Sequence, residues 1–360
     1  MKKVMIYAYT NFNLGDDLFI KVLCERYPHT KFILHAPREY KVNLNEIENI
    51  TIIPDDTLIV RGINFLSRKL KFEFLTRNLI AKNCDMAVLI GGSLFIELDN
   101  WQHAYELKKN MLIKNKPFFL LGANFGPYKD RNFQLKYKEL FKEYTDICFR
   151  EQYSYDLFEN LNNIRMADDI IFQLEKSVEE EVENYIVISV IKPSEKNIPN
   201  FDEIYYQKLR DIAIYFIERE LNVTFMSFCE SEGDKEAIEN VIKIIPEKYS
   251  NKIKKHLYKL NMEETLGVIA KSKFVIATRF HAMIVGWVYN KPVFPIAYSK
   301  KMTNVINDVG FEGSYIELAN LHNLEPEIVY NSLDTNSIDV SKQAINAKNH
   351  FKKLDEYLLK

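Results

Sequence analysis

The sequence has few cysteines, and they follow none of the patterns in which cysteine does structural or redox chemistry. Only four of the 360 residues are cysteine, namely Cys24, Cys84, Cys148 and Cys229. They are far apart in the chain, no CxxC pair occurs and no histidine lies at ligand spacing, so neither a disulfide framework nor a zinc site is indicated. Scattered thiols suit a reducing compartment. We therefore expect a cytoplasmic protein without a metal site.

Long apolar runs and a strong net charge are missing too. The apolar part of the amino terminus, Val4–Tyr9, is too short for a signal peptide, and no run approaches the roughly 20 apolar residues of a membrane span. The formal net charge is −2, so bulk electrostatics favours neither a nucleic acid nor an anionic membrane as a partner. We expect no nucleic-acid partner and no membrane span, with peripheral membrane association left open.

Two nucleotide-binding patterns are absent as well: no GxGxxG follows the first predicted strand, and no GxxxxGK[ST] occurs. The chain instead alternates short apolar, β-branched runs with segments of helical periodicity. A length of 360 residues suits two domains of about 150–180 residues each. We therefore predict an α/β protein with two doubly wound Rossmann-like domains and a central cleft.

The predicted domain boundary lies in the acidic stretch Glu175–Asn184, which lacks a core pattern and is typical of a solvated linker. The N-terminal domain then covers residues 1–178 and the C-terminal domain covers residues 179–335. Residues 336–360 contain a charged helix, predicted over Ile338–Leu359, that we expect to cross back onto the N-terminal domain. Another helix or helix pair is predicted over Ile63–Lys82.

One stretch of the second domain combines a strand, two cations and a buried helix. Lys273–Ala277 has the pattern of a strand, and the apolar run Met283–Tyr289 that of a buried helix. Thr278 is a suitable N-cap, which places Arg279 and His281 in the first helical turn. Because the start of a helix attracts anions, two cationic side chains there indicate an anion site. A histidine satisfied within the core is the alternative for His281.

Polar and glycine-rich loops follow the strands of the first domain. At strand ends, amide and carboxylate groups suit the recognition of sugar hydroxyls. Asp16 is either a base that deprotonates a hydroxyl or the N-cap of a helix from Leu18. The glycines either set backbone geometry or contact a ligand directly. The candidates for ligand binding in these loops are Asn13, Gly15, Gly91, Gly92, Ser93, Glu97 and Asn124.

Five short motifs each follow a predicted strand and occur in this order: Asn13-Leu14-Gly15-Asp16, Gly91-Gly92-Ser93, Gly122-Ala123-Asn124-Phe125-Gly126-Pro127, Arg150-Glu151 with Ser154, and Arg279-Phe280-His281-Ala282. In this combination the chain resembles the polysaccharide pyruvyl transferase family over nearly its whole length. That family is similar in architecture to GT-B glycosyltransferases. The resemblance implies transfer of a pyruvyl group from phosphoenolpyruvate to a saccharide, usually as a ketal, in cell-surface polysaccharide biosynthesis.

The resemblance also implies roles for single residues. The Arg-x-His-Ala motif implies phosphoenolpyruvate binding at Arg279 and His281, and His281 is either the general acid or the partner of the leaving phosphate. Lys192 stands where the family has a basic residue, although we expect arginine there, and only two glycines precede Ser93 where the family often has three. The full predicted donor set is Arg279, Lys192, Thr278, Tyr298 and Lys300, with His281 and Asp16 as catalytic residues. The resemblance implies that the candidate loop residues of the first domain, given above, bind the acceptor.

The expected partners are phosphoenolpyruvate, as a co-substrate rather than a cofactor, and a saccharide or lipid-linked oligosaccharide acceptor. No other cofactor is implied. Two alternatives remain open on the sequence. The first is a GT-B-type glycosyltransferase that binds a nucleotide sugar, and the second is a non-catalytic protein that binds a saccharide or an anion.

Overall fold

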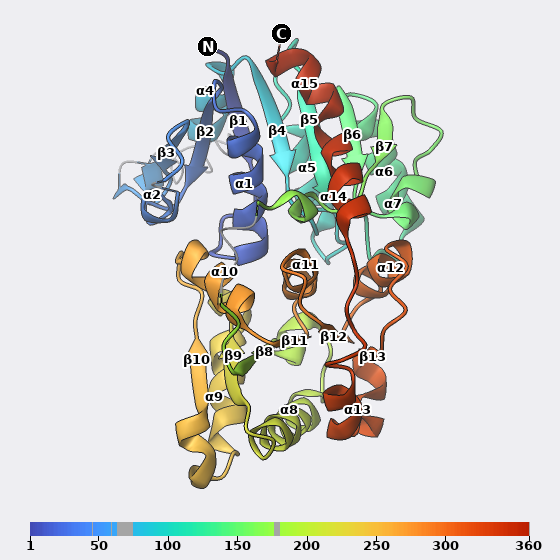
Figure 1. The fold of residues 1–360 in the computed structure, drawn as a ribbon. Helices are drawn as coiled ribbons and strands as arrows, with labels where there is room; N and C mark the ends of the chain where they lie inside the picture. Colours follow the sequence, from blue (N-terminus) through green and yellow to red (C-terminus); the bar gives the residue numbers. More distant parts are fainter. Residues whose placement is uncertain (45, 59, 63–74, 176–180, 360) are drawn as a thin grey trace. The chain divides into compact units, whose positions relative to one another are not determined.

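The computed structural model describes residues 1–44, 46–58, 60–62, 75–175 and 181–359 and divides into two compact units (Figure 1). The first unit comprises Met1–Thr10, Asp16–Gln173 and Ile345–Lys360. The second comprises Asn11–Gly15 and Leu174–Ala344. The predicted boundary at residue 178, like most of the predicted helical segment before residue 75, lies outside the described residues.

The first unit is built on a seven-stranded parallel sheet in the order β3-β2-β1-β4-β5-β6-β7. Its strands are mostly apolar, and β4 is buried along its whole length, as both faces of a parallel sheet require. The elements of this part of the chain are β1 (Lys3–Tyr7), α1 (Leu14–Arg26), β2 (Lys31–Ala36), α2 (Tyr40–Asn43), β3 (Ile50–Pro54), α4 (Leu75–Lys82), β4 (Met86–Ile90), α5 (Trp101–Lys109), β5 (Phe118–Ala123), α6 (Arg131–Phe141), β6 (Asp146–Phe149), α7 (Gln152–Asp156), β7 (Ile164–Met166) and the 3-10 turn η1 (Ile170–Gln173).

The second unit is built on a six-stranded parallel sheet in the order β10-β9-β8-β11-β12-β13. The buried central strand β11 pairs with β8 on one side and β12 on the other. Its elements are β8 (Tyr185–Ser189), η2 (Pro193–Lys196), α8 (Asp202–Ile217), β9 (Asn222–Met226), η3 (Glu230–Glu232), α9 (Asp234–Lys243), η4 (Glu247–Lys252), β10 (Ile253–His256), α10 (Met262–Lys271), β11 (Phe274–Ala277), α11 (Phe280–Val288), β12 (Val293–Ala297), α12 (Lys300–Asp308), β13 (Ile316–Glu317), η5 (Leu318–Asn323) and α13 (Pro326–Asn331).

The carboxyl-terminal residues join the first unit through short helices. The predicted single helix over Ile338–Leu359 is wrong: the chain forms α14 (Ser341–Ala347), a 3-10 turn η6 (Lys348–Phe351) and α15 (Lys352–Leu358). Figure 1 shows α15 beside β5, where the ring of Tyr357 lies 5.3 Å from that of Phe119.

The predicted α/β class, with two doubly wound parallel sheets, is confirmed. The order in which strands are added to each sheet reverses once, between β1 and β4 in the first unit and between β8 and β11 in the second. In such sheets ligands bind outside the carboxyl ends of the strands next to this switch point. The four cysteines are free and buried. Within the described residues, no helix combines the length and the apolar character that crossing a membrane requires.

Candidate functional site

The switch point of the second sheet is held together by a serine at the end of β8. Ser189 is fully buried, and its hydroxyl oxygen accepts hydrogen bonds from the backbone N–H groups of Thr278 and Arg279, both at 3.1 Å. These two residues follow β11, the neighbouring strand. Ser189 therefore fixes the backbone from which the side chain of Arg279 extends.

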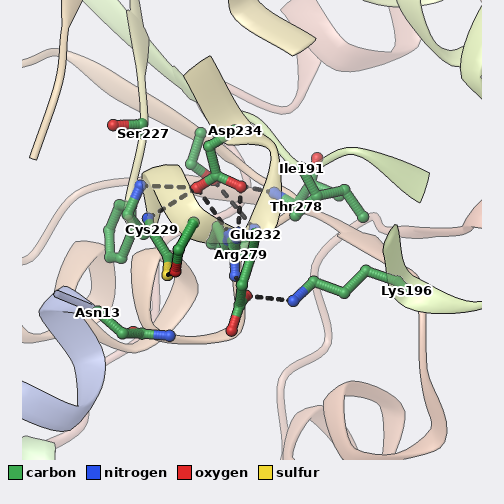
Figure 2. Close-up of polar contacts among 12 residues, drawn as sticks. Asn13, Ile191, Lys196, Ser227, Cys229, Glu232, Asp234, Thr278 and Arg279 are labelled. Carbon is green, nitrogen blue, oxygen red and sulfur yellow. Dashed lines mark hydrogen bonds and ion pairs between the residues drawn. The ribbon is translucent and has the colours of Figure 1, made fainter. Parts of the chain in front are cut away.

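Arg279 is ion-paired with two carboxylates that the sequence analysis did not identify. Its guanidinium donates to Asp234 through Nε, at 3.0 Å, and through Nη2, and its Nη1 donates to Glu232 (Figure 2). The side chain is only 7% exposed, and that of Asp234 is fully buried. Burial opposes the charge, but the two carboxylates raise the pKa of Arg279 well above its ordinary value. A buried guanidinium needs carboxylate partners, and Asp234 and Glu232 supply them, so the predicted role of Arg279 in donor binding stays a prediction.

The carboxylate of Asp234 is fixed by backbone hydrogen bonds as well as by Arg279. Its Oδ2 also accepts hydrogen bonds from the backbone N–H groups of Phe228, at 2.8 Å, and Cys229, at 2.9 Å. The loop after β9 is thus closed onto the same carboxylate that orients Arg279. Asp234 is a positioning residue of this edge of the sheet.

Glu232 bridges two cations. Besides Arg279, its carboxylate pairs with Lys196 at the end of η2 (Figure 2). Partial burial disfavours the charge of Glu232, but Arg279 and Lys196 outweigh this effect and lower its pKa to about 2. Lys196 belongs to no recognisable motif, and only the fold brings it to Arg279, 83 residues further along the chain. The contact of Lys196 with this site could therefore not be predicted from the sequence.

Thr278 has a structural role that differs from the helix cap predicted for it. Its side chain is fully buried, and its Oγ1 accepts a hydrogen bond from the hydroxyl of Tyr205 at 2.9 Å. The N-cap of α11 is Arg279, one residue later, without a side-chain capping bond. The predicted cap at Thr278 is therefore wrong, and its role in donor binding stays a prediction.

His281 lies in the first turn of α11, as predicted, and is partly exposed. Its ring contacts that of Phe280 and lies against Gly15, where a β-carbon would overlap the imidazole. Gly15 and Asn13 group with the second unit rather than the first, and Asn13 Oδ1 accepts a hydrogen bond from the backbone N–H of Gly15 at 3.0 Å. The assignment of Asn13 and Gly15 to the N-terminal domain is therefore wrong.

The remaining predicted donor residues follow β8 and β12. Lys192 is not free: its ammonium group pairs with both oxygens of Glu236 at 2.9 Å and lies 3.8 Å from Glu195. Tyr298 follows β12, and Lys300 is the exposed first residue of α12. Burial of Tyr298 opposes its ionisation, but the cations Lys301, Lys196 and Arg279 lower its pKa. Tyr298 therefore belongs to the electrostatic environment of Arg279.

In the first unit, the predicted loops surround a buried arginine. Arg150 donates to Asp169 at 2.9 Å and to Asn124 Oδ1 at 2.7 Å, and Gly92 packs so closely on its guanidinium that a β-carbon there would lie 2.5 Å from Nη1. Ser93 donates to the same oxygen of Asn124 at 3.4 Å. Asn124 is only 4% exposed and its amide oxygen serves this network, while its role in acceptor binding stays a prediction.

Three further acceptor-side predictions concern Asp16, Gly91 and Glu97. Helix α1 begins at Leu14, so Asp16 lies inside its first turn and is not the N-cap of a helix from Leu18. Gly91 has a φ of +146°, and a β-carbon there would lie 3.3 Å from Oδ1 of Asp16. Glu97 Oε2 accepts hydrogen bonds from two backbone N–H groups, those of Lys129 and Asp130, and so fixes that loop. One oxygen of this carboxylate is thus used by the loop, and the role of Glu97 in acceptor binding stays a prediction.

Residues 13–300 match the family model described as "Polysaccharide pyruvyl transferase". A curated relative, the "Amylovoran biosynthesis protein AmsJ" of Erwinia amylovora, is 22% identical over 278 residues, which are 70% of this chain and 66% of the relative. The match thus spans just under two thirds of that relative's length.

Solved structures with the same fold include MnaA of S. aureus, determined with UDP. It has a TM-score of 0.62 and 12% identity, with 99% of this chain and 97% of that chain covered. Another is HepE of Anabaena in complex with UDP-glucose, with a TM-score of 0.60 and 13% identity, and 99% of both chains covered. At these identities the likeness concerns the fold alone.

Proposed function

This chain belongs to the polysaccharide pyruvyl transferase family, and from that premise we propose that it transfers a pyruvyl group from phosphoenolpyruvate to two hydroxyls of a saccharide. The product is a cyclic ketal on a polysaccharide or on its lipid-linked precursor. The name of the curated relative, a biosynthesis protein, supports a biosynthetic role.

The observation that carries the proposal is the set of cations at the carboxyl edge of the second sheet. Arg279 follows β11, Lys192 and Lys196 follow β8, and Lys300 follows β12. Phosphoenolpyruvate carries a carboxylate and a phosphate on the same carbon, so it needs several charge-assisted donors on one side of a site. Cations of this kind follow three strands of the second unit, and Arg279, Lys192 and Lys196 are also paired with carboxylates.

The chemistry needs one proton donor and one proton acceptor. A proton is added to the methylene carbon of the enol phosphate, and a sugar hydroxyl attacks the adjacent carbon, which bears the phosphate. The C–O bond to phosphate breaks with its electron pair, and the second hydroxyl closes the ketal. Two hydroxyl protons are lost from the saccharide. One replaces the proton that was delivered to the methylene carbon, and the other is taken up by the leaving phosphate.

We assign His281 to this proton transfer or to the leaving phosphate, because imidazole exchanges a proton near neutral pH. Its position in the first turn of α11, two residues after Arg279, supports that role. Asp16, in the first turn of α1, is the proposed base for the acceptor hydroxyl. Gly91 and Ser93, which follow β4, are the proposed acceptor-side neighbours of Asp16.

The test is a comparison of donors. Phosphoenolpyruvate should raise the melting temperature of the full-length protein. When a suitable saccharide is added, the protein should release phosphate from phosphoenolpyruvate. His281→Ala should keep most of the donor-induced stabilisation and lose turnover by about 10²–10⁴-fold. Stabilisation by nucleotide sugars alone would instead support the glycosyltransferase alternative. Normal turnover by His281→Ala would remove the role given to that residue.

A further inference from the structure

One carboxylate in the second unit holds two cations that come from different loops. Glu232 lies at the end of η3, after β9, and pairs with Arg279, after β11, and with Lys196, after β8. Figure 2 shows its side chain between the two cationic groups. We call Arg279 and Lys196 the two-cation seat. Glu232 occupies this seat.

The two acidic partners of Arg279 differ in how firmly they are held. Asp234 is fully buried and also accepts two backbone hydrogen bonds, so its removal would leave buried groups unpaired. The side chain of Glu232 is 22% exposed, and both of its ion pairs are with other side chains. The backbone N–H of Glu232 donates to the carbonyl of Cys229 at 3.2 Å, a bond that does not involve the carboxylate. The Glu232 side chain can therefore leave the seat by rotation alone.

The charges favour replacement of Glu232 by another anion. With Glu232 in place, the positive charges of Arg279 and Lys196 are matched by Asp234 and Glu232. Without it, one positive charge is left unmatched, and Lys301 adds another cation near Tyr298. An anionic oxygen group of a small ligand can restore the balance with the same charge-assisted hydrogen bonds.

We propose that Glu232 is an internal substitute for the ligand, and that the carboxylate or phosphate of the donor displaces it from the two-cation seat. This inference rests on the proposed function for the identity of the donor, but the seat itself requires only a small anion. Glu232 thus competes with the donor, and Lys196 becomes a donor-binding residue. The affinity of the native protein for the anion is lowered by the free energy needed to move Glu232 out.

The experiment measures the binding of inorganic phosphate, pyruvate and phosphoenolpyruvate to the full-length protein by calorimetry. Glu232→Gln removes the competing charge but keeps the shape of the side chain, and it should bind phosphate or pyruvate about tenfold more tightly than the native protein. Glu220→Gln is the matched control. Glu220 lies just before β9, at the opposite edge of the sheet, and is 88% exposed, so this change should leave the affinity as it is.

Equal affinity of the native protein and Glu232→Gln for all three anions, or no binding to either, would overturn the inference. If Glu232→Gln does not fold, Lys196→Gln tests the same seat, because Arg279 then keeps Asp234. That variant should bind the anions about tenfold more weakly, and unchanged affinity would again overturn the inference. Tighter phosphate binding by Glu232→Gln without any consumption of phosphoenolpyruvate would support the seat and contradict the proposed function.

Discussion

Gly15 lies against the imidazole of His281, a proposed catalytic residue, and leaves no room for a larger side chain. Because a β-carbon at Gly15 would overlap the imidazole of His281, Gly15→Ala must push that ring away. The ring is partly exposed and can move, so we expect the protein to stay folded while pyruvyl transfer falls by about a hundredfold. The measurement is the rate of phosphate release from phosphoenolpyruvate with the acceptor present, together with the melting temperature.

A matched glycine serves as the control for this prediction. Gly267 lies inside α10, and no atom would come within 4 Å of a β-carbon added there, apart from those of its own neighbourhood in the helix. Gly267→Ala should therefore leave turnover unchanged and stabilise the helix by up to about 1 kcal/mol. Full activity of Gly15→Ala would show that the position of the His281 ring does not matter for the reaction.

Single residues also mark the limit of what the sequence could predict. The sequence singled out Arg279 because a guanidinium keeps its charge and stands beside a histidine at a helix start. Its partners Asp234 and Glu232 lie 45 and 47 residues earlier, in a loop after another strand. Nothing local connects them, since only the pairing of β8 with β9 and β11 brings those loops to one edge. Whether Arg279 was free or paired was therefore not readable from the sequence.

The element η6 contains a histidine whose surroundings exclude a positive charge. His350 is fully buried, and burial together with the cation Arg165 lowers its pKa to about 3. The unfolded chain binds this proton at pH values below about 6.5, whereas the folded chain does not. Stability should therefore be complete above pH 6.5 and fall by up to about 1.4 kcal/mol for each pH unit below it.

The effect of His350 can be measured by urea unfolding between pH 7.5 and pH 4.5. His350→Met removes the titrating group, so the part of the acid destabilisation that belongs to His350 should vanish. His29→Met is the control, because it also removes a histidine, and His29 lies exposed before β2. An equal pH slope for the native protein and His350→Met would contradict the assigned cause.

Elements were predictable where burial dominates the pattern. The central strands β4 and β11 and the buried helix α11 are short apolar runs, and their location follows from hydrophobicity alone. The start of α11 was misplaced by one residue, because Thr278 has a capping side chain but uses it to bind Tyr205. The predicted final helix is broken at η6, where His350 and Phe351 are buried. The helical spacing of charged residues in this segment gives no indication of such a break.

At the scale of the whole chain, the alternation of elements indicated two parallel sheets, but it could not assign every segment to its unit. Residues 11–15 separate β1 from most of α1 in sequence, yet group with the second unit. The motif Asn13-Leu14-Gly15-Asp16 is therefore divided between the two units. Local sequence patterns carry no information on such a division, because it depends on contacts with residues more than 200 positions away, such as the hydrogen bond from Leu14 N–H to the Phe228 carbonyl.

The return of the chain to the first unit makes that unit dependent on its last residues. Phe351 and Leu354 are fully buried there, and Asp355 accepts hydrogen bonds from Arg26, at 3.1 and 2.7 Å, and from Tyr27 at 2.7 Å. Burial of the two apolar side chains contributes roughly 3–6 kcal/mol, comparable with the stability of a whole domain.

A chain that ends at Ala344 should therefore lose hydrogen-exchange protection in strands β1 to β7 while β8 to β13 keep theirs. A chain that ends at Leu358 loses only the exposed Leu359 and one further residue, so it should match the native protein. Equal loss of protection in both sheets of the chain ending at Ala344 would show that the two units unfold as one.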